Sequence, residues 1–110
     1  MDKQISFLPA YNFTKFNFSN LKKGKEKFDL IYDSKNFYIQ IIYSKKVNSS
    51  WMKNDTIENV FLLKGKAILE DENKNIIKMK KGDFLTIKEE LKHKINWSSR
   101  KCIWIALHHK

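Results

Sequence analysis

The sequence of 110 residues has few of the residues that bend or cross-link a chain: three glycines, one proline and one cysteine. The single cysteine, Cys102, excludes an internal disulfide and a cysteine-based zinc site, and its place in an apolar run indicates packing. No apolar run approaches the roughly 20 residues that span a membrane, and the first ten residues lack the long apolar core of a signal peptide. We therefore expect a cytoplasmic protein with no membrane partner.

Arginine is also scarce, although the formal net charge is +10. Of the 22 basic residues only Arg100 is an arginine, and arginine is the side chain that grips phosphates and guanine edges with two parallel hydrogen bonds. The lysines are scattered along the chain and not gathered in one arm. These features argue against nucleic-acid binding, and a basic structural or regulatory module is kept as an alternative.

Short apolar runs separated by polar turns make up most of the chain, which has the length of one domain with one core. The runs are rich in β-branched and aromatic residues, as strands are. They lie at 28–33, 37–43, 60–63, 67–70, 76–79, 84–87, 93–97 and 102–108. Together with a short strand at Phe16 and Phe18, they predict a single all-β domain over 1–110, a barrel or sandwich of eight to ten short antiparallel strands.

Alternation within the last two predicted strands assigns their side chains to faces. In the first of the two, His93, Ile95 and Trp97 share one face. In the last strand, the same period puts Trp104 and His108 on one face.

The segment 1–24 is the least regular part of the chain, and it is rich in large apolar and aromatic residues. These are Phe7, Leu8, Tyr11, Phe13, Phe16 and Phe18. Two interpretations stay open: a segment pinned across its own domain by aromatic anchors, or an arm at a dimer interface. We expect a homodimer.

Two spacings in the second half of the chain form a pattern. Glu58 is separated by six residues from Gly65, and Gly82 is followed after ten residues by His93. Over about residues 28–108 this pattern resembles the two motifs of the cupins. The resemblance implies a double-stranded β-helix, which is a jelly-roll barrel with a pocket inside.

The resemblance also implies a metal site, but an incomplete one. Cupins normally hold a divalent metal with three histidines and one glutamate; this chain keeps Glu58 and His93, whereas the other two positions hold Met52 and Asn54. A thioether and an amide are poorly matched to Fe, Mn, Ni or Zn. His108 could complete a set of two histidines and one carboxylate if the last strand lies beside the strand of His93.

The pocket leaves several functions open. Its expected lining is Trp51, Met52, Asn54, Trp97, Trp104 and His108, with Glu58 and His93 as the catalytic pair. The first hypothesis is a protein that binds a small polar molecule, in which His93 can act as acid or base near neutral pH. The second is a metal-dependent cupin enzyme of the dioxygenase or sugar isomerase or epimerase type, and the third is the basic module.

Overall fold

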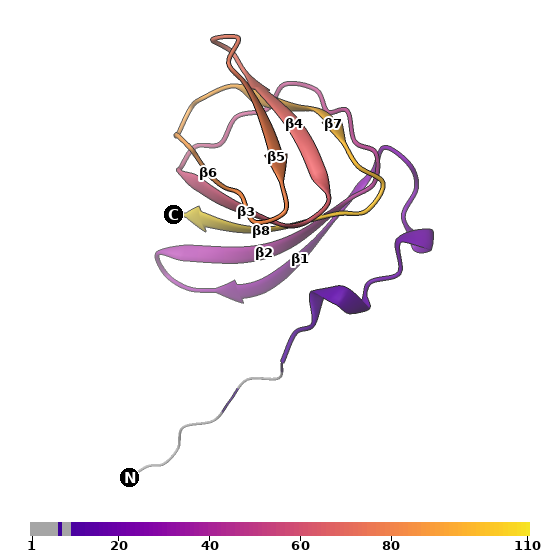
Figure 1. Cartoon of the computed structure of the whole chain (residues 1–110). Helices are drawn as coiled ribbons and strands as arrows, with labels where there is room; N and C mark the ends of the chain where they lie inside the picture. The colour runs from indigo at the N-terminus through magenta and orange to yellow at the C-terminus, as the bar shows by residue number, and fades with distance from the viewer. Residues whose placement is uncertain (1–6, 8–9) are drawn as a thin grey trace.

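The computed structural model describes residue 7 and residues 10–110, and in this part of the chain eight strands form two antiparallel sheets (Figure 1). The strands are β1 (Glu26–Asp33), β2 (Phe37–Ser44), β3 (Glu58–Lys64), β4 (Lys66–Asp71), β5 (Ile76–Lys80), β6 (Phe84–Ile87), β7 (His93–Ser98) and β8 (Cys102–His109). All eight apolar runs of the sequence form strands, so the all-β prediction is confirmed.

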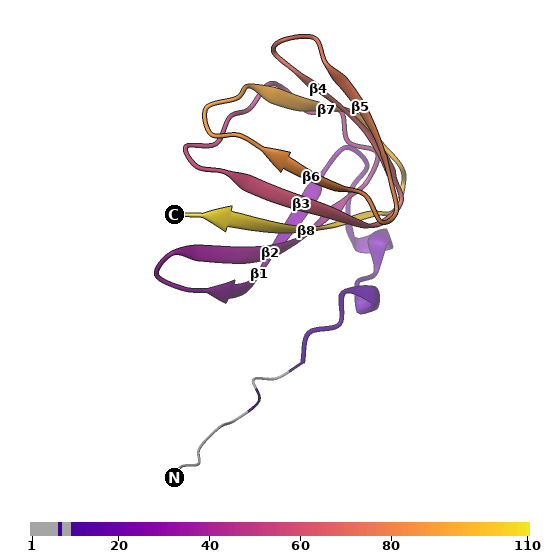
Figure 2. The same cartoon turned by 60° about the vertical axis from the view of Figure 1, so that its left-hand side comes forward.

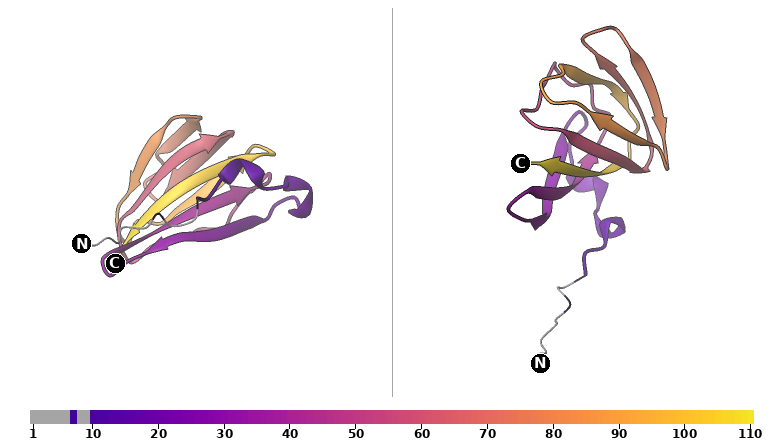
Figure 3. Two further views of the ribbon diagram at one scale, coloured as in Figure 1. Left: turned by 90° about the horizontal axis from the view of Figure 1, so that it is seen from below. Right: turned by 90° about the vertical axis from the view of Figure 1, so that its left-hand side faces the viewer.

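The two sheets face each other and close a barrel around the core (Figures 2 and 3). One sheet has five strands in the order β1-β2-β8-β3-β6, and the other has three in the order β5-β4-β7. The last strand, β8, therefore lies between β2 and β3 and not beside β7, which carries His93. The arrangement on which the two-histidine metal set depended is absent.

Alternating side chains fill the space between the sheets. On β3, Val60 and Leu62 are buried, whereas Phe61 points outward and is exposed. The core cluster comprises Ile42, Val47, Val60, Leu62, Ala67, Leu69, Met79, Ile87, Ile95, Cys102, Trp104 and Ala106. Burying one such large side chain is worth about 1.5–3 kcal/mol, so this cluster is the main support of the barrel. Burial raises the pKa of the Cys102 thiol to about 12, so this side chain is an inert packing residue.

A β-bulge in β7 overturns the prediction that Trp97 shares a face with His93 and Ile95. Ile95 pairs with Leu69, but the next pair joins Trp97 to Ile68, so one residue of β7 is extra. The bulge turns Trp97 outward and leaves it 46% exposed. It also sets the small Ser98 opposite Ala67, inside the barrel, where the Ser98 hydroxyl accepts a hydrogen bond from the Val47 amide at 2.9 Å.

The N-terminal arm, residues 10–25, packs on the outer face of the five-stranded sheet. Phe16 and Phe18 contact the ring of Tyr43, with ring centroids 4.2 and 5.9 Å from it. This packing supports the interpretation of aromatic anchors, although Phe7 is fully exposed and Leu8 lies outside the described residues.

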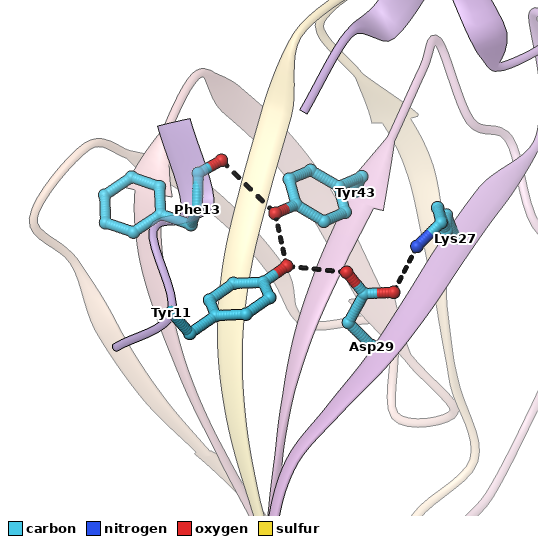
Figure 4. Close-up of polar contacts among 5 residues, drawn as sticks. All are labelled: Tyr11, Phe13, Lys27, Asp29 and Tyr43. Atoms are coloured by element: carbon cyan, nitrogen blue, oxygen red, sulfur yellow. Dashed lines mark hydrogen bonds and ion pairs between the residues drawn. The ribbon is translucent and has the colours of Figure 1, made fainter. Parts of the chain in front are cut away.

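A polar cluster fixes the start of this arm (Figure 4). The Tyr11 hydroxyl donates to Asp29 at 2.6 Å and lies 2.6 Å from the Tyr43 hydroxyl, while Lys27 pairs with the other oxygen of Asp29. Burial and the Asp29 hydrogen bond raise the pKa of Tyr11. The hydroxyl therefore stays protonated and holds the arm as a donor. The Lys27 and Tyr11 hydrogen bonds lower the pKa of Asp29.

The strand predicted at Phe16 and Phe18 is not present. Two 3₁₀ helices lie there instead, Phe13–Lys15 and Phe18–Asn20. The side chains of Asn12 and Asn17 each accept a hydrogen bond from the amide two residues later, at 2.9 and 3.0 Å. Such local capping competes with strand pairing and here prevails over the alternating pattern.

No helix in the described part of the chain is long and apolar enough to cross a membrane.

Gly65 makes the tight connection between β3 and β4. Its φ is +90°, a left-handed conformation that favours glycine. A Cβ atom there would lie 2.5 Å from the Ser99 hydroxyl oxygen and 2.6 Å from the Lys101 carbonyl oxygen. The turn therefore needs glycine both for its conformation and for space.

We predict that Gly65→Ala lowers the free energy of unfolding more than Gly82→Ala does. Both glycines have φ above +85°, so both substitutions carry a left-handed cost of about 1–2 kcal/mol. Only at Gly65 does the new methyl group meet other atoms within 4 Å, which adds about 1–3 kcal/mol. Urea unfolding of the two variants measures the difference, and equal losses would contradict the packing argument.

Candidate functional site

The barrel holds a cavity of about 270 Å³ between its sheets. Its polar lining residues are Glu26, Gln40, Asn54, Glu58, His93 and His108. Its apolar lining residues are Phe28, Ile42, Met52, Val60, Leu69, Ile87, Ile95 and Trp104. The walls are thus mainly hydrocarbon and aromatic, with a few polar groups that point inward, which is the usual composition of a small-molecule site.

Glu58 is the first residue of β3 and lies at the centre of the polar groups. Its side chain is buried, and one carboxylate oxygen, Oε1, accepts a hydrogen bond from Asn54 Nδ2 at 2.7 Å. The other oxygen, Oε2, lies 3.6 Å from His108 Nε2. This proximity follows from the pairing of β3 with β8, which sets Glu58 directly opposite His108.

His108 has a buried nitrogen without a hydrogen-bond partner. The ring stacks on Tyr38 at 4.5 Å with an interplanar angle of 11°, and this contact fixes its orientation. Its Nε2 atom is buried and is unpaired in the described structure. Buried polar atoms nearly always have a partner, so the wall of the cavity carries an unsatisfied polar group at this point.

The end of β8 that carries His108 is held from outside the barrel. Two residues further on, the Lys110 amide donates to the Asn36 carbonyl oxygen at 2.9 Å. The Lys110 ammonium pairs with Asp33 at 2.5 Å and with the Ser34 carbonyl oxygen at 2.8 Å. The turn between β1 and β2 thereby holds the end of β8 in place beside the site.

His93 begins β7, and its backbone is tied to Met52 by two hydrogen bonds of 2.8 Å. Its ring Nδ1 lies 2.9 Å from the carbonyl oxygen of Leu91. Since a carbonyl oxygen only accepts, Nδ1 carries the proton, and in the neutral ring Nε2 is left as an acceptor. His93 and His108 enter the same cavity from opposite sheets.

Glu26 is a second carboxylate in the cavity, and the sequence analysis missed it. It pairs with Ser44 at the start of β1, and the Ser44 hydroxyl donates to it at 2.5 Å. Ser44 in turn accepts from Trp104 Nε1 at 3.1 Å. Extending the predicted strand 28–33 by two residues would have found Glu26, because it then shares the inward face of Phe28.

Burial raises the pKa of Glu26 above its ordinary value, and the nearby charge of Glu58 adds to this rise. The Ser44 hydrogen bond acts in the opposite direction. The site therefore pairs a carboxyl that resists ionisation with a second carboxylate across the cavity.

The structure places most of the predicted site residues in the cavity and leaves two tryptophans outside it. Glu58, His93, Met52, Asn54, Trp104 and His108 line the cavity. Trp97 lies on the outer side of the bulge. Trp51 is 47% exposed, and the Lys94 ammonium sits 4.9 Å from its ring centroid. Neither residue lines the barrel cavity.

Comparison with known proteins decides the fold. No protein-family model matches the sequence, and no curated protein matches it. Among solved structures, a Ralstonia eutropha protein provisionally named a mannose-6-phosphate isomerase superposes with a TM-score of 0.77 and 23% identity, over 93% of this chain and 99% of its own. A cupin-2 domain protein from Shewanella frigidimarina superposes with a TM-score of 0.72 and 16% identity, over 92% of this chain and 95% of its own. The chain has the cupin fold.

A third structure supports this assignment: a cupin superfamily protein from Desulfitobacterium hafniense, with a TM-score of 0.70, 12% identity and 80% of each chain covered. At these identities the likeness establishes the architecture alone. The double-stranded β-helix that the motif spacing implied is thus confirmed.

The donor atoms of this cupin barrel do not fit the divalent metal that the motif implied. Within residues 10–110 no three His, Cys, Asp or Glu side chains are grouped to hold a metal ion. Asn54, at a histidine position of the motif, turns its amide nitrogen toward Glu58, and a protonated amide nitrogen is no metal ligand. Met52, at the other, offers only a thioether, a poor ligand for Fe, Mn, Ni or Zn.

We predict that Glu26→Gln removes a pH dependence of stability. Because the folded-state pKa of Glu26 is raised, the folded protein binds more protons than the unfolded chain above the ordinary glutamate pKa of about 4.3. This stabilisation is complete below the unfolded pKa and is lost as pH rises through the folded pKa. The melting temperature of the wild type should therefore fall more than that of Glu26→Gln as the pH rises from about 4.3 through the folded-state pKa of Glu26.

The control is Glu89→Gln, which makes the same change at an exposed glutamate and should follow the wild type at every pH. Melting curves across the window measure all three proteins. If Glu26→Gln keeps the wild-type pH profile, Glu26 is not the group that titrates.

Proposed function

We propose that this protein binds a small molecule inside the cupin barrel, held by Glu58, His93 and His108 without a resident metal ion. The observation that carries the proposal is the unpaired, buried Nε2 of His108, which lies beside a buried carboxylate in a mainly apolar cavity. A molecule with a polar group at this point gives the nitrogen the partner that it lacks.

The size and lining of the cavity narrow the range of possible ligands. Ligand sites commonly enclose about 300–1,000 Å³, and the volume here, about 270 Å³, lies just below that range and therefore suits a small molecule. Leu69, Ile87 and Ile95 offer apolar walls to a carbon skeleton. Glu58 Oε2 and the acceptor nitrogen of His93 favour a hydroxyl or an amine, which donates hydrogen bonds.

The same groups support acid–base chemistry on the bound molecule as a second candidate function. Glu58 Oε2 and His108 Nε2 lie 3.6 Å apart, so one polar group of a bound molecule can contact both atoms and exchange a proton with either. A sugar isomerase uses acid–base groups of this kind to move protons between neighbouring carbon and oxygen atoms of its substrate, and an isomerase name is carried by the Ralstonia eutropha structure. A metal-dependent version of this chemistry is the less favoured alternative, given the donor set.

We predict that His108→Gln weakens ligand binding about tenfold, which corresponds to the loss of one buried hydrogen bond. The probes are a panel of sugars, sugar phosphates, hydroxy acids and primary amines, ranked by the rise in melting temperature that each gives the wild type. His109→Gln is the matched control, because His109 is the exposed neighbour on the same strand. His109→Gln should keep wild-type affinity for every hit.

Two results would overturn this proposal. One is a panel hit whose affinity is equal in the two variants. The other is a melting temperature that rises with Mn, Ni, Fe or Zn in the wild type and not in His93→Gln, which would favour the metal-dependent enzyme.

The homodimer expected from the sequence stays a prediction, and the structure offers a surface for it other than the arm. An open groove of about 340 Å³ crosses the outer face of the five-stranded sheet. It is lined by Ile39, Asn59, Phe61, Phe84, Ile105 and Leu107. None of these side chains is charged, so two copies of a chain with a net charge of +10 can meet there without facing like charges.

We predict that Phe61→Lys shifts the protein from dimer to monomer, because it places a positive charge in the groove where the two copies would meet. Ile77→Lys is the control: Ile77 is 40% exposed against 41% for Phe61, but it lies on β5 in the other sheet. Light scattering coupled to size exclusion at micromolar concentration measures the mass. A wild-type monomer, or a dimer that survives Phe61→Lys, would refute the proposed interface.

A further inference from the structure

The chain topology gathers basic residues at one end of the barrel. The connections at this end carry Lys22, Lys23 and Lys25 before β1, Lys45 and Lys46 after β2, Lys64 and Lys66 beside Gly65, Lys80 and Lys81 before β6, and Arg100 and Lys101 before β8. Backbone hydrogen bonds join these connections: the Lys46 amide donates to the Ser99 carbonyl oxygen, and the Ser99 amide donates to that of Lys66. The lysines that look scattered in sequence are clustered in space.

Acidic residues do little to balance this end. Of the described carboxylates nearby, Asp83 lies 3.8 Å from the Lys80 ammonium, and Glu26 turns into the barrel toward Ser44. Most other acids lie in the connections at the opposite end, beside the Glu58 cavity, as in Asp71, Glu72 and Glu90. The barrel is therefore polarised along its length, with its positive end opposite the end that carries Glu58, His93 and His108.

A hollow of about 490 Å³ lies within this basic end. Lys45, Lys64, Arg100 and Lys101 line it, and no carboxylate does. The N-terminal arm closes one side with the polar side chains of Thr14, Asn17 and Ser19. The hollow shares no residue with the barrel cavity.

The cations that line the hollow have no carboxylate partner among the described residues. The Lys45 ammonium donates to the Phe18 carbonyl oxygen at 3.1 Å, which fixes it against the arm. No ion pair joins Lys64, Arg100 or Lys101 to any carboxylate of the described residues. Like charges that line one hollow repel, and an anion bound in the hollow relieves the repulsion.

The donor set matches phosphate. The only arginine of the sequence is here, and its planar guanidinium can give two parallel hydrogen bonds to phosphate oxygens. Lysine ammonium groups add point charges, and the hydroxyls of Thr14 and Ser19 are further donors. We infer that this hollow binds a small molecule that bears a phosphate or diphosphate group, as a second site separate from the barrel cavity.

Nucleic acid fits the hollow less well. Single-stranded nucleic acids are held by exposed aromatic rings on which bases stack, but Phe18 is buried and Phe16 packs on Tyr43. The site is a hollow closed on one side by the arm, and not a track for an extended phosphate backbone.

The test is a calorimetric titration with pyrophosphate at low ionic strength, on the full chain. Arg100→Gln/Lys101→Gln should weaken binding about tenfold or more, since hydrogen bonds to charged groups are lost. Lys35→Gln/Lys88→Gln is the matched control, because it removes the same net charge from exposed lysines at the opposite end. It should keep affinity within about twofold of the wild type. Melting curves establish that both variants are folded.

Three outcomes would overturn the inference. The wild type could show no heat of binding with pyrophosphate. The two double variants could lose affinity equally, which would assign the effect to bulk charge. A single-stranded oligonucleotide could bind tightly where pyrophosphate does not, which would make the basic end a nucleic-acid surface.

Discussion

The register between β3 and β8 is the constraint on which the rest of this barrel depends. These two central strands set Glu58 opposite His108, Val60 opposite Ala106 and Leu62 opposite Trp104. Side chains alternate between faces, so a slip of one residue would send the polar pair to solvent and its apolar neighbours with it. The pairing of β3 with β8 therefore specifies both the core and the site, since the side chains that it buries in the barrel also fix the distance from Glu58 to His108.

That coupling explains why so much could be inferred from the sequence alone. Alternation and turn residues located all eight strands, and the spacing from Glu58 to Gly65 and from Gly82 to His93 indicated the cupin barrel. That Trp104 and His108 share a face also followed from period two, and the structure shows that this face points into the barrel. Each of these signals is a local sequence pattern that decides which side chains are buried in the core.

The features that sequence reasoning missed depend on pairing between distant strands or on local capping. Trp97 faces outward because β7 carries a bulge opposite β4, and no residue type at that position announces it. Glu26 reads as a polar residue before a strand until its pairing with Ser44 is known. The aromatic arm forms 3₁₀ turns because Asn12 and Asn17 satisfy nearby amides more readily than a neighbouring strand could.

The contacts that Lys110 makes with the β1–β2 turn have a consequence for how this end of the barrel opens. Strand ends fray, and the free energy of such local opening lies far below that of global unfolding. The contacts from Lys110 to Asp33 and Ser34 are exposed, whereas the middle of β8 is locked by Trp104 and Ala106 in the core. His108 itself is paired on both sides, with Tyr38 on β2 and Glu58 on β3, so it stays in place when these surface contacts open. Salt, which weakens the ion pair between Lys110 and Asp33, would therefore loosen the chain end and the β1–β2 turn before it disturbs the paired strand that carries His108.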